Sequence, residues 1–486
     1  MQFVRYRRSD WFALPGDFEW PLIGNFIQMY GPAKESRQFK YISPAFRRFG
    51  PIFRFRAFGT RLVFLADPEA AKIVFTSKAY HKGPELQQAF VGINQYGLPV
   101  LPDGATWKRH RRNCQPAFSP ASLRLAFAAA NKHVDHLSHS LRKAAQATGQ
   151  GTVVMNLKRI TRSILTDVMG DVLLSHSFGR TKTLFDANGQ PVNEEDDRDE
   201  ILDVKRLFAP VAVRMVTPSW MWRLKLIEKG EMVIPRGYYR HHAQAENSEE
   251  TAPRDMVKSL APDATHDMLD RLIETEAFDD EELIDEIFAF MLAGHDTTAS
   301  ALLFLIFELA SNTPVRERLL REIAEVVSPD VGAAASHSQM TYEHLSRLPY
   351  LDCVIKELFR VHPVTRDIVR TVREPTVLMG YKLPVGTTIS VQTADLNMDP
   401  RVWKNPKTFD PDRFADGAPL QQKTIVFGIG QHVCIGEKMA IVELKAAVVA
   451  LLRQFTFRVI PGQDIVPINS ITTTLVNGLM VEITPL

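Results

Sequence analysis

The chain has 486 residues, of which 45% are hydrophobic and 23% are charged. Lysine and arginine number 58 against 56 acidic residues, so the formal net charge is only +2 and argues against a nucleic-acid-binding protein. The three cysteines are too few and too scattered for a disulfide framework or a clustered zinc site, and they suit a reducing cytosol. The length alone suggests about three domains. No linker, repeat or low-complexity block divides the chain, however, so we expect one domain over residues 1–486.

The N-terminal 30 residues contain neither a signal-peptide core nor a run of about 20 apolar residues that would span a bilayer. Residues 11–30 are rich in aromatic residues and proline. We expect them to pack on the body of the domain, because a basic amphipathic helix is missing from this stretch; contact with a membrane surface is the alternative. The sequence therefore predicts a cytoplasmic protein without a transmembrane anchor.

Next along the chain, residues 52–58 and 61–65 flank Gly59-Thr60 and indicate a β-hairpin. From residue 68 to about 360 the apolar spacing is mostly helical. Breaks fall near residues 97–104, 186–197 and 246–262, and the last two of these are polar enough to predict surface loops.

Beyond Pro363 the pattern changes to short runs typical of strands, at residues 376–379 and 387–391. Residues 470–483 are rich in threonine, valine and leucine around Asn477-Gly478, which is a hairpin signal. The sequence therefore predicts a mainly α fold with a minor β region.

Within a long helical pattern at residues 281–310, Ala289, Ala293 and Thr297 recur every four residues and share one face. An apolar helix is interrupted there by Gly294, Asp296 and two threonines, and such residues lower helix stability. The interruption indicates a function. The alternative is a threonine that bonds back to its own helix and an Asp296 on a solvated face.

Pairs of charged or aromatic residues at helical spacing mark two further segments, and a third segment follows them. Trp107 and Arg111 lie four residues apart, and Glu357 and Arg360 lie one helical turn apart. Arg413 follows in the segment Phe409-Asp410-Pro411-Asp412-Arg413-Phe414.

The most specific segment is Phe427-Gly428-Ile429-Gly430-Gln431-His432-Val433-Cys434-Ile435-Gly436. Gly428 and Gly430 lack a Cβ, so the backbone there can turn sharply and approach a flat cofactor. A helical pattern begins at Gly436. We expect the helix N-terminus to lower the pKa of the Cys434 thiol.

Taken together and in this order, these segments resemble the cytochrome P450 family of haem-thiolate monooxygenases. The cysteine segment matches Phe-Gly-x-Gly-x-[Arg/His]-x-Cys-x-Gly, and residues 293–298 match [Ala/Gly]-Gly-x-[Asp/Glu]-Thr-[Thr/Ser]. The resemblance implies the P450 fold, with a helical body, a long central helix over the haem and small β-sheets. It also implies non-covalently bound haem b, with Cys434 as the ligand of the iron.

Further roles follow from the same resemblance. Thr297 would hydrogen-bond dioxygen, Asp296 would relay protons from solvent, and Gly294 would sit where the helix loosens over the haem. Glu357, Arg360 and Arg413 would form a buried structural network, with Asp412 in place of the family's usual glutamate. The residues expected to contact the haem are Trp107, Arg111, Ala293, Arg370, Phe427, His432, Cys434 and Gly436, of which Trp107, Arg111, Arg370 and His432 would bind its propionates. Substrate-facing positions would include residues 90–101, Ala289, residues 364–369 and the turn at residues 471–472.

The resemblance implies insertion of one oxygen atom of O2 into a hydrophobic substrate by a bacterial-type, monomeric enzyme. No flavin or iron–sulfur motif occurs in the sequence, so electrons from NAD(P)H would arrive through a separate ferredoxin or flavodoxin with its reductase. A basic face would attract that acidic donor, formed by Arg109, Arg111, Arg112, Lys438 and Lys445. Two alternatives stay open: a haem-thiolate peroxygenase or isomerase, and a haem sensor that only binds ligands. The acid–alcohol pair Asp296-Thr297 favours the monooxygenase.

Overall fold

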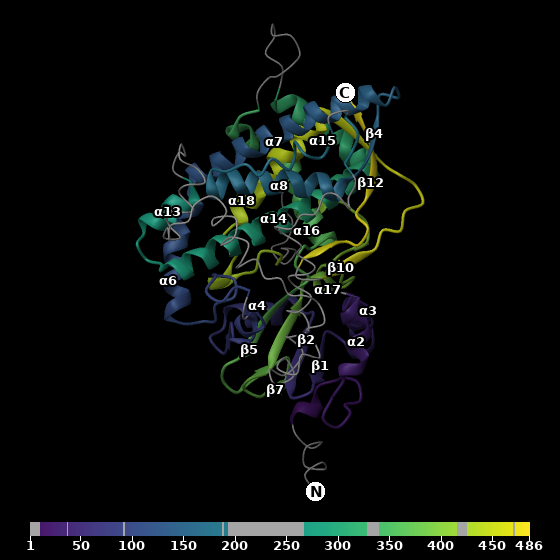
Figure 1. Ribbon diagram of the computed structural model, residues 1–486. Helices are drawn as coiled ribbons and strands as arrows, with labels where there is room; N and C mark the ends of the chain where they lie inside the picture. The colour runs from purple at the N-terminus through teal and green to yellow at the C-terminus, as the bar shows by residue number, and fades with distance from the viewer. Residues whose placement is uncertain are drawn as a thin grey trace.

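The computed structural model describes residues 10–35, 37–90, 93–186, 189–192, 267–327, 340–415, 425–469 and 472–486. Within these residues a large helical body lies against a smaller region of sheet and N-terminal helices, and α14 runs through the middle of the body (Figure 1). This confirms the predicted mainly α fold with a minor β region. Of the loop expected at residues 186–197, residues 186 and 189–192 are described and form a turn in which the Asp186 N–H donates to the Gln190 carbonyl at 2.9 Å; the loop expected at residues 246–262 lies outside the described residues.

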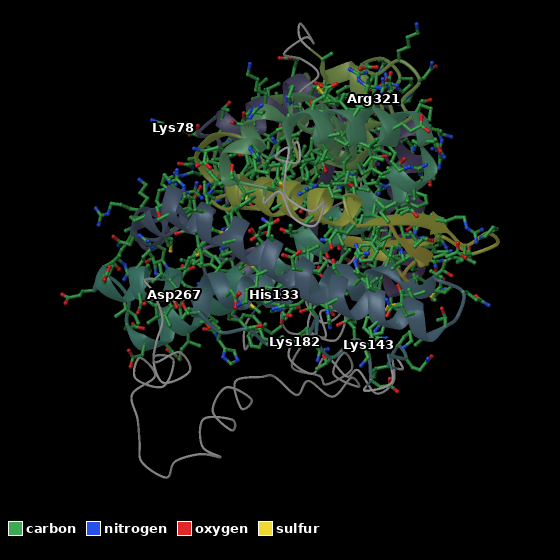
Figure 2. All side chains as sticks on the ribbon, turned by 90° about the horizontal axis from the view of Figure 1, so that it is seen from above. Lys78, His133, Lys143, Lys182, Asp267 and Arg321 are labelled. Atoms are coloured by element: carbon green, nitrogen blue, oxygen red, sulfur yellow. The ribbon has the colours of Figure 1, made fainter. Side chains whose placement is uncertain are left out.

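The helices of the described ranges are α2 (Phe26–Lys34), α3 (Phe39–Phe49), α4 (Pro68–Thr76), α5 (Glu85–Ala89), α6 (Ala105–Cys114), α7 (Pro120–Ala147), α8 (Leu157–Leu174), α13 (Met268–Glu274), α14 (Asp280–Ser311), α15 (Thr313–Val326), α16 (Pro349–Val361), α17 (Thr393–Asn397) and α18 (Glu437–Leu452). Short 3₁₀ turns are η1 (Asp10–Ala13), η2 (Gln115–Phe118), η3 (Tyr342–Arg347), η4 (Pro411–Phe414) and η6 (Gly430–His432). Figure 2 shows side chains filling the spaces between the helices of the body.

The strands are β1 (Ile52–Ala57), β2 (Thr60–Leu65), β3 (Tyr80–His81), β4 (Val153–Asn156), β5 (Asp367–Val372), β6 (Thr376–Leu378), β7 (Tyr381–Leu383), β8 (Thr388–Gln392), β9 (Phe455–Val459), β10 (Pro467–Asn469), β11 (Thr473–Leu475) and β12 (Met480–Pro485). They form a five-stranded sheet in the order β1-β2-β8-β5-β3, a three-stranded sheet β4-β12-β9, and the pairs β6-β7 and β10-β11.

The hairpin predicted near residue 59 is confirmed, because β1 and β2 pair antiparallel from Ile52↔Leu65 to Ala57↔Thr60. The hairpin predicted around Asn477-Gly478 is wrong. β11 pairs with β10, whereas β12 pairs with β4 and β9, so this turn leads from one sheet to another. Gly478 has φ of 70°, and a Cβ there would lie 2.1 Å from Asn156 Oδ1, so close packing rather than hairpin geometry demands the glycine.

The expected packing of residues 11–30 on the domain is confirmed only in part, because Phe18, Trp20, Leu22, Ile27 and Tyr30 are 52–84% exposed. Trp11 and Leu14 are buried, and Trp11 Nε1 donates to Glu19 Oε1 at 2.8 Å. One helix of the described chain, α14, has the length and apolar composition to cross a membrane, but 78% of its most apolar window is buried inside the protein. Burial of this kind is that of a core helix.

α14 begins at a capping box in which the Asp279 side chain accepts from the Glu282 N–H and the Glu282 side chain accepts from the Asp279 N–H. α14 packs against α8 and α18. The glycine in its centre is required by that packing, because a Cβ on Gly294 would lie 2.6 Å from Met169 Sδ of α8. α14 is therefore fixed as the axis of the helical body.

A buried carboxyl group between α14 and α18 makes stability depend on pH. Glu443 is 1% exposed, and burial raises its pKa from 4.5 to about 8, opposed by the nearby hydroxyl of Thr298. Because the pKa of Glu443 is higher in the folded than in the unfolded chain, its protonated form favours folding. This stabilisation is complete below pH 4.5 and is lost as pH rises through about 8.

We therefore expect the always neutral Glu443→Gln variant to gain stability relative to wild type as pH rises from about 5 to about 8. Denaturant unfolding of both proteins at the two pH values measures this. If the difference in unfolding free energy between wild type and Glu443→Gln does not change with pH, Glu443 is not protonated in the folded protein.

Candidate active site

The cysteine segment forms a tight loop immediately before α18. The Cys434 N–H donates to the Phe427 carbonyl at 2.8 Å, and Gly428 and Gly430 have φ of 72° and 78°. A Cβ on Gly430 would lie 2.8 Å from the Phe75 carbonyl oxygen at the end of α4. Glycine therefore permits both the left-handed backbone and the close approach of the loop to α4.

The Cys434 thiol lies deep in the protein but is not covered by it. Its side chain is exposed, yet the surrounding protein groups partly desolvate the thiol. This desolvation is the largest influence on the pKa of Cys434, and it raises that pKa. The N–H groups of Gly436 and Glu437 and the charge of Arg111 act in the opposite direction. The expected lowering of this pKa is therefore wrong in its net direction, because burial outweighs the helix N-terminus.

The α14 face predicted to carry function has an uncovered centre. Ala293 is exposed although most of α14 is buried, and Thr297 Oγ1 donates to the Ala293 carbonyl at 2.6 Å. The loosening expected at Gly294 is wrong, since α14 continues unbroken from Asp280 to Ser311. The back-bonded threonine considered as an alternative is thus present, on the side of the helix that stays accessible.

Asp296 does not lie on a solvated face. It is 6% exposed, and its Oδ2 accepts a hydrogen bond from the hydroxyl of Thr472, which is also buried. The neighbouring His295 is fully buried, and burial together with Arg162 and Arg180 lowers its pKa well below the ordinary value. His295 is therefore neutral and buried between the helices, and it does not lie on the accessible face of α14 that carries Ala293.

The aromatic and basic residues predicted to bind propionates converge from α6, β5 and the cysteine loop. The rings of Trp107 and His432 lie 4.2 Å apart, and His432 Nε2 lies 2.7 Å from Asp103 Oδ1. Arg370 is 6% exposed and burial lowers its pKa, while its guanidinium donates only to the Val369 carbonyl, at 2.7 Å. In the described part of the chain, neither Arg370 nor the half-buried Arg111 has an ion-pair partner.

Two further residues of this cluster escaped the sequence analysis. Lys82 Nζ donates to the Leu98 carbonyl at 2.9 Å, and burial together with the charge of Arg370 lowers its pKa to about 7. Asp103 accepts from the Lys82 N–H at 3.1 Å and pairs with His432. No spacing marks Lys82 or Asp103 in the sequence, because only the folded chain brings them to Arg370.

The predicted structural network is present and fully buried. Arg360 binds Glu357 through two hydrogen bonds of 2.7 Å each, and both side chains are 0% exposed. Arg360 also donates to the carbonyls of Asn397, Pro406 and Thr408.

Glu357 Oε1 accepts in addition from the Asp410 N–H at 2.8 Å and from Arg413 at 3.3 Å. Asp412 points elsewhere, to the surface residue Arg318 at 2.7 Å. The substitution of aspartate for the usual glutamate therefore leaves the buried network untouched.

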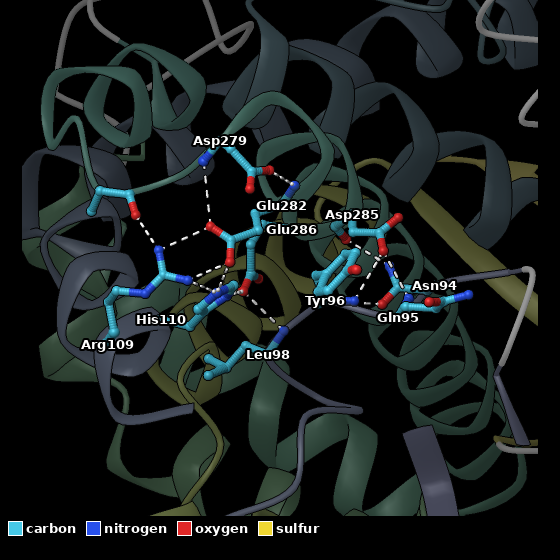
Figure 3. A network of polar contacts seen from close by, with 12 residues as sticks. Asn94, Gln95, Tyr96, Leu98, Arg109, His110, Asp279, Glu282, Asp285 and Glu286 are labelled. Carbon is cyan, nitrogen blue, oxygen red and sulfur yellow. Dashed lines mark hydrogen bonds and ion pairs between the residues drawn. The ribbon is translucent and has the colours of Figure 1, made fainter. Parts of the chain in front are cut away.

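The predicted basic docking face is wrong in two of its five residues. Lys445 is 6% exposed and pairs with Asp352 at 2.7 Å. Arg109 Nη1 donates to Glu282 Oε2 of α14 at 2.9 Å, in a network that joins α6 to α14 (Figure 3). Arg112 and Lys438 remain exposed.

The structure thus combines an accessible thiol on a glycine loop, an accessible alanine on a central helix, and two guanidinium groups, one buried and one half-buried, without ion-pair partners in the described residues. A buried cation without a partner is costly, so a dianionic ligand is the natural complement of Arg111 and Arg370. A haem supplies two carboxylates and an iron that binds thiolate. The residues present fit this group.

Comparisons with known proteins agree with this fit. The model of the cytochrome P450 family matches residues 14–482. The chain is 26% identical to cytochrome P450 4d2 of Drosophila melanogaster over 93% of this chain and 89% of the relative. It is 24% identical to mouse cytochrome P450 3A11 over 92% and 86%, and 27% identical to the taurochenodeoxycholic 6 alpha-hydroxylase of Sus scrofa over 87% and 82%.

A haem-thiolate oxygenase is the class that the fold and the site define. The chain belongs to the cytochrome P450 family, and it is a haem-containing monooxygenase of that family. Enzymes of this family use redox partners and act on hydrophobic substrates.

Removing one partner of a buried ion pair leaves the other charge uncompensated. We expect Glu357→Ala to destabilise the protein by about 3–5 kcal/mol and to abolish haem incorporation. Haem content and the unfolding midpoint after expression with added haem precursor measure both effects. Arg318→Ala is the matched control, because its pair with Asp412 is half exposed and should contribute about 0–1 kcal/mol. Normal haem content in Glu357→Ala would contradict the assignment.

Proposed function

We propose that Cys434 is the proximal ligand of the haem iron. The observation that carries this proposal is an accessible thiol on the glycine loop before α18; burial raises its pKa overall, and the N–H groups of Gly436 and Glu437 and the charge of Arg111 oppose this rise. Bound haem supplies the binding and reductive activation of dioxygen. Phe427 and Gly436 lie beside Cys434, and the accessible Ala293 of α14 would offer the haem a small side chain.

Arg111, Arg370, His432 and Trp107 are proposed to hold the haem propionates. Arg111 and Arg370 lack carboxylate partners in the described ranges, and Arg370 and Trp107 are buried. Lys82 adds a third cation beside Arg370, and Asp103 pairs with His432. The excess of positive charge supports a dianion at this place.

Asp296 and Thr297 are proposed to move protons on the distal side. The hydroxyl of Thr297 lies on the uncovered face of α14, where its Oγ1 can exchange the Ala293 carbonyl for an incoming acceptor. Asp296 Oδ2 holds the hydroxyl hydrogen of Thr472, so a rotation of either side chain is needed before the carboxylate carries a proton to the face. An acid next to an alcohol supports oxygen insertion over the peroxygenase, isomerase and sensor alternatives.

The substrate, the redox partner, the location and the domain organisation of the protein are also proposals. The substrate is a hydrophobic molecule on the face of Ala289 and Ala293, and electrons from NAD(P)H reach the haem through a ferredoxin or flavodoxin with its reductase. The exposed cations Lys108, Arg112 and Lys438 support docking of an acidic donor. We further propose a cytoplasmic monomer with a single catalytic domain over residues 1–486.

The first test is the carbon monoxide difference spectrum of the dithionite-reduced protein. Wild type is expected to give the strongly red-shifted Soret band of thiolate ligation, and Cys434→Ser to lose it, because an alcohol does not replace the thiolate. Cys353→Ser, at a half-buried cysteine on α16, is the matched control and should keep the band. A histidine-type Soret band in wild type would remove Cys434 from this role.

The second test compares two neighbouring threonines of α14. Thr297→Val should lower the product formed per NAD(P)H consumed by at least about tenfold, because the proton-relaying hydroxyl is lost. Thr298→Val changes a residue that is buried toward Glu443 and should leave this ratio near that of wild type. Reconstituted turnover of any lipophilic substrate that wild type oxidises provides the measurement. Equal ratios in the two variants would contradict the role of Thr297.

A further inference from the structure

Near its N-terminus α14 carries two adjacent buried carboxylates, Asp285 and Glu286, which are 4% and 0% exposed. Burial of a carboxylate is costly unless its oxygens are hydrogen-bonded. In the described residues Asp285 has no cation within ion-pair distance. Its Oδ2 accepts instead from the peptide N–H groups of Gln95 at 2.7 Å and Tyr96 at 2.9 Å (Figure 3).

The segment that Asp285 holds is bound to α14 along its length. The Asn94 side chain donates to the Asp285 carbonyl at 2.6 Å and accepts from the Gly97 N–H at 3.0 Å. The Leu98 N–H donates to Glu286 Oε1 at 2.9 Å. Most of these bonds use backbone groups, so they fix the path of residues 94–98, hereafter the 94–98 loop, whatever its exposed side chains are.

The 94–98 loop lies on α14 near the proposed active site. Asp285 and Ala289 are neighbours on the helix surface, and so are Ala289 and Ala293, because each pair is four residues apart. Ala289 is about 6 Å and Ala293 about 12 Å beyond Asp285 along the helix. A Cβ on Gly97 would lie 2.8 Å from Ala289 Cβ, which places the loop directly on that residue.

We propose that Asp285 is a positioning residue that sets the length of ligand the active site accepts. Its carboxylate fixes the 94–98 loop as a wall at Ala289, one turn before the accessible Ala293. A ligand anchored near Ala293 can extend along α14 only until it meets the loop. The inference rests on the proposed haem site, because it places the anchored end of the ligand there.

The test is a length series of n-alkylimidazoles added to the ferric haem protein, with binding read from the Soret shift. Imidazole binds the iron, and each added methylene that finds apolar contact should tighten binding about fourfold. In wild type this gain should stop, and binding weaken, at the chain length that reaches the loop. In Asp285→Ala the limit should move to longer chains, with at least about tenfold tighter binding of the chains that wild type rejects and unchanged binding of imidazole itself.

Two variants separate the role of Asp285 from a general disturbance. Asp285→Asn keeps one amide oxygen that can accept from both N–H groups, and it should restore the wild-type limit. Glu282→Gln alters a carboxylate one turn earlier, whose partners Arg109 and His110 lie on α6, and it should leave the limit unchanged. If Asp285→Ala does not fold, Asn94→Ala loosens the same loop from its own side and should move the limit in the same direction.

Amide hydrogen exchange gives a readout that does not involve ligand or turnover. In Asp285→Ala the N–H groups of Gln95 and Tyr96 should exchange at least about tenfold faster, with exchange in the centre of α14 unchanged. The same length profile in wild type and Asp285→Ala, with imidazole still shifting the Soret band, would overturn the inference and leave the haem site intact. Failure of imidazole itself to shift the band in wild type would overturn both.

Discussion

The fully buried ion pair between Glu357 and Arg360 is the interaction on which the site depends most. Neither charge is solvated, so every donor and acceptor of the pair must be met by the protein. The carbonyls of Asn397, Pro406 and Thr408 and the N–H of Asp410 meet them. The pair therefore fixes the long segment between α17 and η4, which leads toward the cysteine loop.

Buried cations gather around Arg370, whereas buried carboxylates gather near the N-terminus of α14. Around Arg370 the protein buries an excess of cations, which suits an anionic cofactor. Near its N-terminus α14 buries carboxylates, which bind α6 and the 94–98 loop. One helix carries, in sequence, the tie to the loop, the small residues of the uncovered centre and the hydroxyl of Thr297. The proposed roles in positioning the loop and in delivering protons thus belong to the same helix.

Several features of this protein were determined by the sequence alone, because local physics specifies them. The β1–β2 hairpin follows from alternating residues and a turn, and α14 from its apolar spacing and cap. The glycines around Cys434 mark a backbone that other residues rarely adopt, so the loop could be recognised before it was seen. Glu357 and Arg360 belong here as well, since one helical turn brings them together wherever the helix lies.

Only the tertiary structure decided which charges are buried and what they meet. Lys445 was expected at the surface and is buried against Asp352, and Lys82 joins Arg370 although nothing in the chain links them. Gly294 serves packing against Met169 rather than a loosened helix, and the turn at Gly478 connects two sheets rather than one hairpin. The contacts of Asp285 join residues about 190 positions apart. Pairings over such separations depend on how whole elements pack, and no local pattern in the chain encodes them.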